Sequence, residues 1–285
     1  MNHLRGVAGM VIIAALLAGC RTPGLPDVGT LTSLATTTTK AARPISDEEE
    51  YYVGRAVSAR ILSTHSLTKD AGLTEYVNLV GMTVALNSDK PLTYGGYHFS
   101  VLEAREVNAF ASPGGTIFIT RGMIASVRNE EELAAVLAHE VAHINHRDGI
   151  DAIKSSRWTE VATIVGKETV RSYTPGQIST LVNLFEGSVD DVFKTIVVNG
   201  YGRTQEKSAD ETALVILARS GYDPRALTAY IERLGAQQGG TAGGIAATHP
   251  DTAERIEKIR SMMPPAKPDA ALVQKRTERF LRYSR

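Results

Sequence analysis

The stretch NEEELAAVLAHEVAHINHR, residues 129–147, contains neither proline nor glycine and predicts one continuous helix. Asn129 with Glu132 three residues later forms a capping-box-like start, and the acidic residues there suit the positive end of a helix dipole. Arg147, before Gly149, marks the expected end. The apolar residues that recur at helical spacing are Leu133, Val136, Leu137, Val141 and Ile144.

Within this helix, the sequence HEVAH at residues 139–143 has the spacing of a metal site. Residues four apart on a helix differ by about 40° around the axis and about 6 Å along it, so His139 and His143 project from one face. Two neutral imidazoles suit zinc, and Glu140 can accept a proton from a water on that ion. The alternative is a solvated His-Glu face without a metal.

A second acidic pair offers the remaining ligand. Glu206 and Asp210 lie four apart in RTQEKSADE, residues 203–211, and share a helix face. Zinc with two histidine ligands needs a third protein ligand and leaves a fourth position for water. Glu206 is our candidate for that ligand, and Asp210 can orient a ligating histidine by accepting its other ring N–H. The same pair is also compatible with a charged, solvated face.

The segment NAFASPGG at residues 108–115 lies between two predicted strands, at 96–103 and 116–120. Its Pro-Gly-Gly end is a turn, which by itself explains the segment. In a second interpretation, the part before the turn is an exposed strand edge beside the metal that pairs with an extended peptide backbone. The residues of that edge are Asn108, Ala109, Phe110 and Ala111.

His249 lies in the sequence His-Pro-Asp, after the glycine-rich residues 237–244. A single histidine before proline is most simply a turn residue. On a glycine-flanked loop it can instead swing toward the metal or toward a developing oxyanion. The residues alone leave both interpretations open.

The other segments are expected to form scaffold. Ser46, followed by four acidic residues, opens a helix, and a second helix spans residues 72–87. Residues 172–202 are broken repeatedly by proline and glycine, so we expect a mobile cover over the site or irregular packing there. We assign residues 45–263 to one domain and residues 264–285 to a basic, exposed C-terminal tail.

Residues 1–19 have the order of a signal peptide: a basic residue, Arg5, then an apolar run and a small-residue end. The end, LAGC, resembles the lipobox of bacterial lipoproteins, which implies that Cys20 is the lipidated first residue of the mature protein. By a similar resemblance to the Gram-negative sorting pattern, Arg21 in place of aspartate favours the outer membrane. An ordinary signal peptide or an uncleaved anchor is the alternative.

Residues 20–44 are rich in threonine, proline and glycine and are expected to be a flexible tether. Because Cys20 is the single cysteine, no disulfide is expected within the fold. The 31 basic and 31 acidic residues give zero formal net charge, which does not indicate a partner nucleic acid or a polybasic membrane patch. The sequence does not indicate the oligomeric state.

Four motifs, in this order, resemble the M48 family of zinc metallopeptidases. They are NAFASPGG at 108–115, HEVAH at 139–143, R-x-x-E-x-x-A-D at 203–210 and H-P-x-x-x-x-R at 249–255. The resemblance implies an α+β, mainly helical, gluzincin-type domain with a small β-sheet beside the HEVAH helix. It also implies one zinc ion (Zn²⁺) per chain.

The resemblance assigns a role to each residue of the proposed centre. His139, His143 and Glu206 hold the zinc, Glu140 is the general base and later the proton donor, and Asp210 supports the ligands.

By resemblance to periplasmic family members, His249 can approach the zinc and block its open position, with Arg255 as a partner. Arg203 begins the second acidic motif, and the resemblance also favours the edge-strand interpretation of residues 108–111. In contrast to some family members, we expect neither membrane-spanning helices nor a tetratricopeptide-like repeat after the domain. Arg147-Asp148 replaces a frequent Arg-His pair, which we expect to be harmless.

Together these features predict a zinc endopeptidase that acts on misfolded or misassembled cell-envelope proteins. We expect it to be lipid-anchored through Cys20 at the outer membrane, facing the periplasm, with unfolded proteins as substrates. One alternative is a chaperone-like or binding lipoprotein whose zinc is capped by His249. Two others are a processing peptidase for one partner and a structural lipoprotein without metal.

Overall fold

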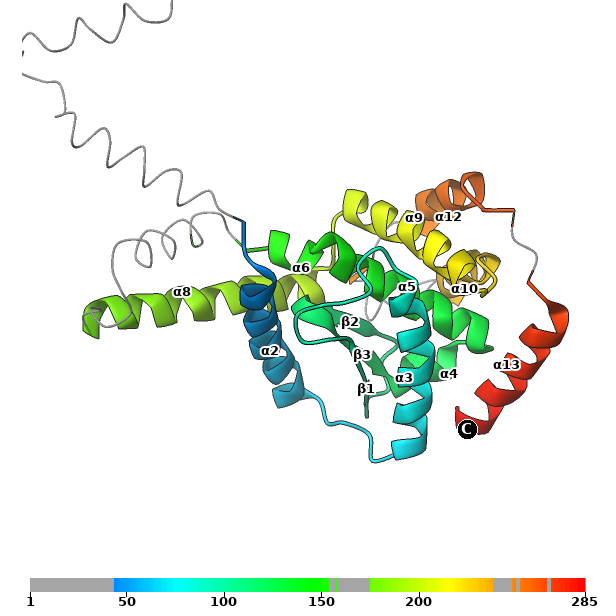
Figure 1. Cartoon of the computed structure of the whole chain (residues 1–285), viewed down its shortest axis with the longest axis horizontal. Coiled ribbons are helices and arrows are strands. Elements are labelled where there is room, and N and C mark those ends of the chain that lie inside the picture. Colours follow the sequence, from blue (N-terminus) through cyan, green and yellow to red (C-terminus); the bar gives the residue numbers. More distant parts are fainter. Residues whose placement is uncertain are drawn as a thin grey trace, which may run out of the picture.

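The computed structural model describes residues 44–153, 157, 175–237, 248–249, 252–265 and 268–284. The expected signal peptide, Cys20 and the tether before residue 44 lie outside the described residues. The described helices surround a small sheet near the middle of the molecule (Figure 1). The predicted α+β, mainly helical fold with a small sheet is confirmed.

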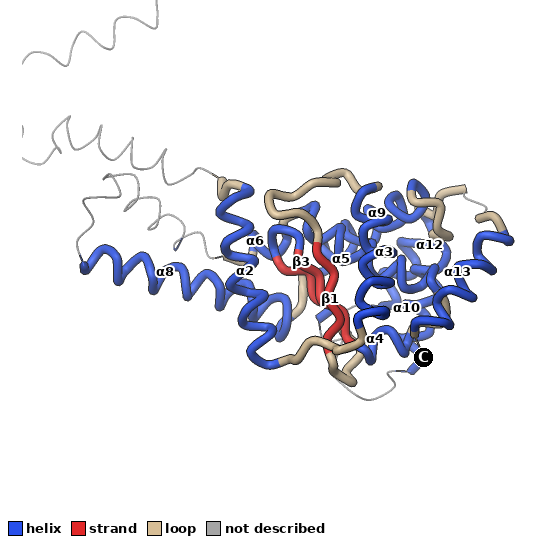
Figure 2. The backbone as a smooth tube through the Cα atoms, turned by 60° about the horizontal axis from the view of Figure 1, so that its bottom comes forward, coloured by secondary structure: helices blue, strands red, loops and turns tan. Residues whose placement is uncertain are grey.

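The sheet consists of β1 (His98–Leu102), β2 (Ala109–Ser112) and β3 (Thr116–Thr120). β3 lies between the others, parallel to β1 and antiparallel to β2. Figure 2 shows the strands in red, with helices around them. The short helix η2 (Pro113–Gly115) joins β2 to β3. Gly114 there has a φ of 78°, which residues with a side chain rarely adopt, so the predicted Pro-Gly-Gly turn is confirmed.

The helix predicted from residues 129–147 is α5 (Glu130–His146), which is buried along most of its length. The Asn129 side chain accepts a hydrogen bond from the backbone N–H of Glu132 at 3.0 Å, as expected of a cap. Arg147 ends the helix in the left-handed conformation, with a φ of 63°. This left-handed residue reverses the chain directly after the helix.

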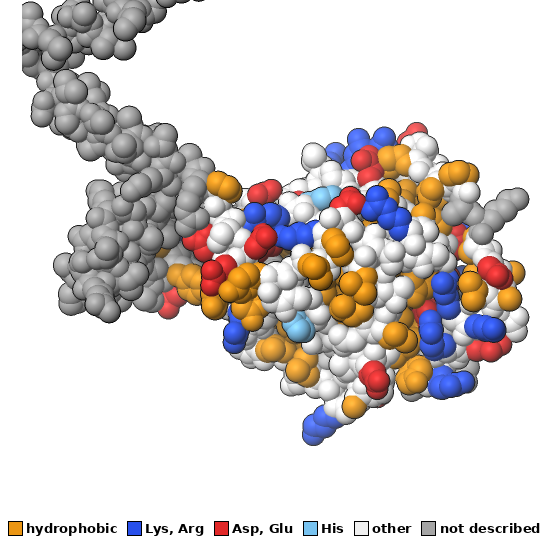
Figure 3. Space-filling model, in the orientation of Figure 1, with side chains coloured by type: hydrophobic (Ala, Val, Ile, Leu, Met, Phe, Trp, Pro, Cys, Tyr) orange, Lys and Arg blue, Asp and Glu red, His pale blue; other side chains and the backbone are white. Residues whose placement is uncertain are grey.

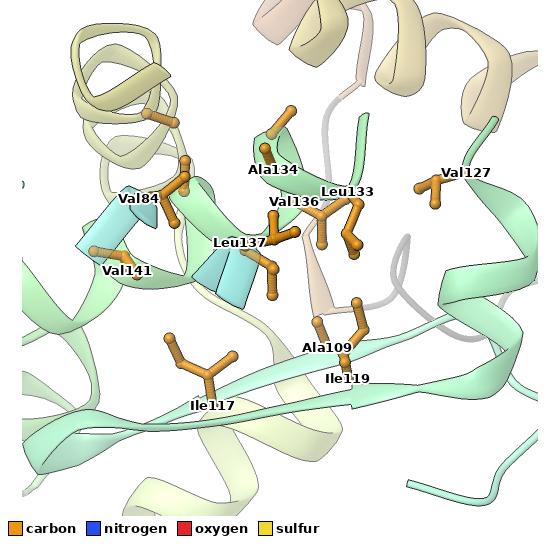
Figure 4. Packing of buried hydrophobic residues seen from close by; sticks show 14 of the residues in the cluster. Val84, Ala109, Ile117, Ile119, Val127, Leu133, Ala134, Val136, Leu137 and Val141 are labelled. Atoms are coloured by element: carbon orange, nitrogen blue, oxygen red, sulfur yellow. The ribbon is translucent and has the colours of Figure 1, made fainter. Parts of the chain in front are cut away.

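A hydrophobic core lies on each face of the sheet, because side chains alternate along each strand. Ile117 and Ile119 belong to one core, and Phe118 between them belongs to the other. Figure 4 shows Leu133 and Leu137 of α5 on the Ile117 and Ile119 face of the sheet. The sheet therefore serves as a platform for α5.

Further helices complete both layers. α2 (Asp47–Thr64) begins with the capping box of Ser46 and Glu49 and lies over the Phe118 face of the sheet. α3 (Ala71–Leu86) packs against α5 and β1. Both helix starts agree with the sequence prediction.

α9 (Arg203–Arg219) lies along α5 and shares with it the most extensive contact between two elements. α10 (Arg225–Gln237) packs on α5, and α12 (Thr252–Ser261) packs on α9 and α10. The short helices α4 (Arg121–Ser126) and α6 (Asp148–Asp151) follow β3 and α5 directly. The pairing of α5 with α9 brings the two predicted ligand motifs together.

The region predicted to be irregular contains regular structure instead. α8 (Pro175–Phe193) is a helix of 19 residues, followed by the π-helical segment η4 (Lys194–Asn199). Pro175 is the first residue of α8, where a missing backbone N–H removes no helical hydrogen bond. Val189 and Val192 of α8 are buried against the core that contains Phe118. Proline and glycine were therefore misleading signals here.

The prediction of an exposed tail at the C-terminus is also wrong, because this segment contains a helix that packs on the domain. Residues 264–285 include α13 (Ala270–Tyr283), which packs on α5 and α3. Phe280 is buried, and the Tyr283 ring stacks on Tyr76 with 5.0 Å between ring centroids. α13 is thus part of the folded domain.

No helix within the described ranges has both the length and the apolar character needed to cross a membrane. On the face shown in Figure 3, acidic and basic side chains are interspersed. Exposed ion pairs such as Arg260 with Glu232 contribute at most about 1 kcal/mol each, so the buried elements determine the fold.

Candidate metal centre

The second half of α5 holds three buried polar side chains. His139, Glu140 and His143 are 5%, 1% and 1% exposed. Because α5 is covered by the sheet and by α9, these side chains are held inside the domain rather than on a solvated face. The Nε2 atoms of the two histidines lie 3.1 Å apart, so both rings point at the same place.

Glu206, in the first turn of α9, faces both histidines. One carboxylate oxygen lies 3.4 Å from His139 Nε2, and the other lies 3.5 Å from His143 Nε2. The residue is completely buried. The structure therefore places the carboxylate predicted from the second motif beside the histidine pair.

Two further carboxylates determine which ring nitrogens face the centre. Asp210 Oδ1 lies 3.0 Å from His139 Nδ1, and Asp148 Oδ2 lies 2.7 Å from His143 Nδ1. Ionised carboxylates only accept, so each Nδ1 carries a hydrogen and each Nε2 directs a lone pair inward. A positive species, a proton or a metal ion, is needed between the two Nε2 atoms. This donor set fits a divalent metal.

His249 completes the cluster as a fourth possible ligand. Its Nδ1 lies 2.8 Å from Glu206 Oε1 and 3.3 Å from His139 Nε2. One ligand atom from each of His139, His143, Glu206 and His249 lies within 4.8 Å of the other three, the one such group found among the described residues. The histidine before proline is thus at the centre and not in a remote turn.

Glu140 is a buried carboxylate of the centre. Within the described part of the chain, neither of its carboxylate oxygens has a hydrogen-bond partner. Its Oε1 lies 3.7 Å from His249 Nε2. An unsatisfied buried carboxylate destabilises a fold, so its position indicates a group that binds water or substrate there.

Arg255, on α12, pairs with both Asp210 and Glu206 of α9. Its Nε and Nη2 donate to the two oxygens of Asp210, each at 2.8 Å, and its Nη1 lies 2.9 Å from Glu206 Oε2. Nη1 also donates to the backbone carbonyl of His249 at 3.3 Å. Arg203, by contrast, has a 73% exposed side chain at the start of α9, 4.0 Å from Glu254.

The electrostatics of the centre favour positive charge at its middle. Burial alone would lower the pKa of His139, but the carboxylates of Asp210 and Glu206 outweigh it and raise the pKa to about 10. Burial alone would raise the pKa of Glu206, and the surrounding histidines instead hold it well below its usual value. For Asp210, Arg255 likewise outweighs burial and lowers the pKa.

Two residues at this centre have no role predicted from the sequence. Asp148, which we expected to be a harmless replacement, accepts from His143 because the left-handed Arg147 turns the chain back toward α5. The Tyr201 ring stacks on His143, with centroids 4.1 Å apart and planes at 22°. Burial, and then the charge of Glu140, raise the pKa of the Tyr201 hydroxyl well above its usual value. A sequence signal for Tyr201 was its position two residues before the second acidic motif.

The predicted substrate edge is only partly as expected. β2 pairs with β3 alone, so it is an edge strand of the described sheet. It is not exposed, because Phe110 packs into the core beneath α2, and Asn108 Oδ1 accepts a hydrogen bond from Thr248 Oγ1 at 3.3 Å. All four residues of the predicted edge are at most 5% exposed: Asn108, Ala109, Phe110 and Ala111.

The fold and the centre together define a metallopeptidase-type domain, in which α5 carries an HExxH motif and α9, which packs along it, carries a carboxylate beside the two histidines. Residues 73–263 match Peptidase family M48. The chain belongs to this family, and the resemblance inferred from the four motifs is confirmed.

Curated relatives are similar over most of this chain. The beta-barrel assembly-enhancing protease of Escherichia coli (strain K12) is 26% identical over 284 residues, covering 93% of this chain and 55% of the relative. Metalloprotease YcaL of the same organism is 23% identical over 265 residues, covering 91% of this chain and 97% of the relative. The mitochondrial metalloendopeptidase OMA1 of Schizosaccharomyces pombe is 33% identical over 161 residues, covering 56% of this chain and 44% of the relative. The chain spans about half the length of the beta-barrel assembly-enhancing proteases that it matches.

Proposed function

We propose that this chain is a zinc-dependent endopeptidase that hydrolyses peptide bonds of misfolded or misassembled cell-envelope proteins. The observation that carries the proposal is the convergence of His139, His143 and Glu206 beside an unpartnered, buried Glu140. Family membership and the names of the relatives agree with a metallopeptidase. Two imidazoles and one carboxylate with an open fourth position are a ligand set of catalytic zinc sites, so we propose zinc as the ion.

In the proposed mechanism, each residue has one task. Glu140 accepts a proton from the attacking water and later delivers it to the leaving nitrogen. Asp148 and Asp210 hold the ligand rings in one tautomer, and Arg255 keeps Asp210 ionised inside the domain. When bound, zinc would polarise the peptide carbonyl and acidify the water.

The proposed substrate is an extended, unfolded chain that lies along Asn108, Ala109, Phe110 and Ala111. A folded segment cannot present a free backbone edge to a strand. Because the Thr248 hydroxyl donates a hydrogen bond to the Asn108 side chain, substrate must first displace the segment that carries His249. Movement of His249 would thus open the fourth position at the metal and the strand edge together.

We place the protein in the cell envelope, with Cys20 as its lipid anchor at the outer membrane facing the periplasm. The LAGC sequence and the beta-barrel assembly-enhancing protease relatives support this location. A globomycin-sensitive mass shift that is lost in Cys20→Ala would support lipidation. An unchanged mass in Cys20→Ala would contradict it.

The test of activity is cleavage of labelled, unfolded casein by the full chain loaded with zinc. We expect cleavage by the wild type, none by Glu140→Gln, and equal or greater cleavage by His249→Ala, because the last variant removes a competing ligand. Lack of cleavage by both the wild type and His249→Ala, with stoichiometric zinc, would contradict the proposal. Lower activity in His249→Ala would mean that His249 assists the reaction.

A second candidate function rests on the position of His249 beside Glu206 and His139. A centre capped in this way also suits a zinc-containing binding or chaperone-like lipoprotein. Binding of unfolded protein without cleavage, in the wild type and in His249→Ala alike, would favour this function. Within the peptidase class, Glu140→Gln used as a substrate trap would separate a processing enzyme with one partner from broad quality control.

A further inference from the structure

The hydroxyl of Tyr201 is a buried polar group without a partner near the metal centre. The residue is 5% exposed, and within the described part of the chain its hydroxyl has no hydrogen-bond partner. Leaving a buried hydroxyl unpaired destabilises a fold by about 1–3 kcal/mol. A phenylalanine would give the same ring packing without that penalty, so packing does not explain the hydroxyl.

The backbone holds Tyr201 in a defined place between η4 and α9. Its N–H donates to the carbonyl of Thr248 at 3.1 Å, next to His249. Gly200 before it has a φ of 76°, and a Cβ there would lie 2.2 Å from the Thr248 carbonyl oxygen. The close approach of these two backbones therefore requires glycine, and it fixes the ring against the centre.

The ring borders two parts of the centre at once. It stacks on His143 at 4.1 Å, and its centroid lies 6.2 Å from that of His249. The His249 ring occupies the fourth corner of the cluster, beside Glu206 and Glu140. A substrate carbonyl that replaces His249 at this corner would lie beside Tyr201.

We propose that the Tyr201 hydroxyl donates a hydrogen bond to the oxygen of the peptide carbonyl under attack. This inference rests on the proposed peptidase function and adds a catalytic residue to it. As the water oxygen bonds to the carbonyl carbon, the π electron pair moves to the carbonyl oxygen, and Glu140 takes the proton from water. The phenol keeps its own proton and stabilises the negative charge by donation.

The test compares Tyr201→Phe with Tyr230→Phe in the zinc-loaded full chain. Both remove one buried hydroxyl, but the Tyr230 hydroxyl is bonded to Met123 Sδ at 2.8 Å and lies away from the centre. For Tyr201→Phe we expect a loss of about 10²- to 10³-fold in kcat, little change in KM, unchanged zinc content, and a Tm that is equal or higher. For Tyr230→Phe we expect a lower Tm and wild-type kcat.

A further readout does not depend on turnover. A phosphinic peptide, which imitates the tetrahedral intermediate, should bind Tyr201→Phe more weakly than the wild type by a similar factor. In protein that carries Glu140→Gln and does not cleave, adding Tyr201→Phe should leave the affinity for a substrate peptide unchanged. Wild-type kcat and wild-type inhibitor affinity in Tyr201→Phe would overturn this inference and leave the proposed function intact. A wild-type protein that cleaves nothing would overturn both.

Discussion

The two ends of α5 carry buried glutamates that differ in whether their oxygens have partners. The three at the start of the helix are at most 4% exposed, and each is paired with an arginine that is distant in the sequence, two on α13 and one on α10. These pairs are Glu130 with Arg279, Glu131 with Arg276 and Glu132 with Arg233. Glu140, two to three turns later, is equally buried and has no hydrogen-bond partner within the described residues.

Glu130 shows how fully the first end is satisfied. Besides its ion pair with Arg279, it accepts hydrogen bonds from the hydroxyls of Tyr76 and Tyr222, each at 3.0 Å. Its charge also lies at the positive end of the helix dipole. The comparison teaches that burial alone does not identify a functional carboxylate. A paired carboxylate stabilises the fold, whereas an unpaired one indicates where a missing reaction partner binds.

The largest expected effect is on activity, at the unpaired end. Replacing Glu140 by glutamine should lower kcat by about 10²- to 10⁴-fold, because the general base is lost. The same change should leave the free energy of unfolding equal or higher, since it removes an unsatisfied charge. Casein cleavage and urea unfolding measure the two quantities. A marked loss of stability would show that Glu140 is structural after all.

The next effect is on stability, at the paired end. Glu130→Ala should destabilise the protein by about 3 kcal/mol, the lower end of the range for a broken buried ion pair, because Arg279 is partly exposed. Activity per folded molecule should be kept. Urea unfolding provides the measurement, and Glu232→Ala, which breaks an exposed pair, is the control with an expected loss below about 1 kcal/mol. An equally small loss in the free energy of unfolding for both variants would show that the Glu130–Arg279 pair does not stabilise the fold.

A smaller effect is expected on metal affinity. Asp148→Asn should weaken zinc binding by about 10- to 100-fold, because the His143 ring loses the acceptor that fixes its tautomer. Competition with a chromophoric chelator measures this affinity. Asp151→Asn, on the exposed side of α6, is the matched control and should bind zinc as the wild type does. Equal affinities would show that Asp148 does not orient the ligand.

Local signals in the sequence predicted much of the fold. Asn129 and Ser46 marked helix starts that the structure has, and residues 116–120 formed the predicted strand, because caps and strand alternation act between near neighbours. α8 was missed because its proline and glycine were treated as breaks, although Pro175 occupies the first helical position.

α13 was missed for another reason. Its arginines and its lysine gave the appearance of a solvated tail, and the acidic partners of two of the arginines, Glu130 and Glu131, lie 149 and 145 residues earlier. No local pattern reports such a pairing. The burial of β2 has the same origin, since Thr248 reaches Asn108 from a distant segment.

The helix that presents His139 and His143 on one face, with Glu140 beside them, can be read from the amino-acid sequence, because helical geometry depends only on residues a few positions apart. Which distant groups complete the centre depends on how the helices pack. Packing of α9 against α5 brings in Glu206, packing of α12 against α9 brings in Arg255, and the chain before α9 places Tyr201 on His143. Those contacts depend on how buried surfaces fit together, and that information is spread over the whole chain.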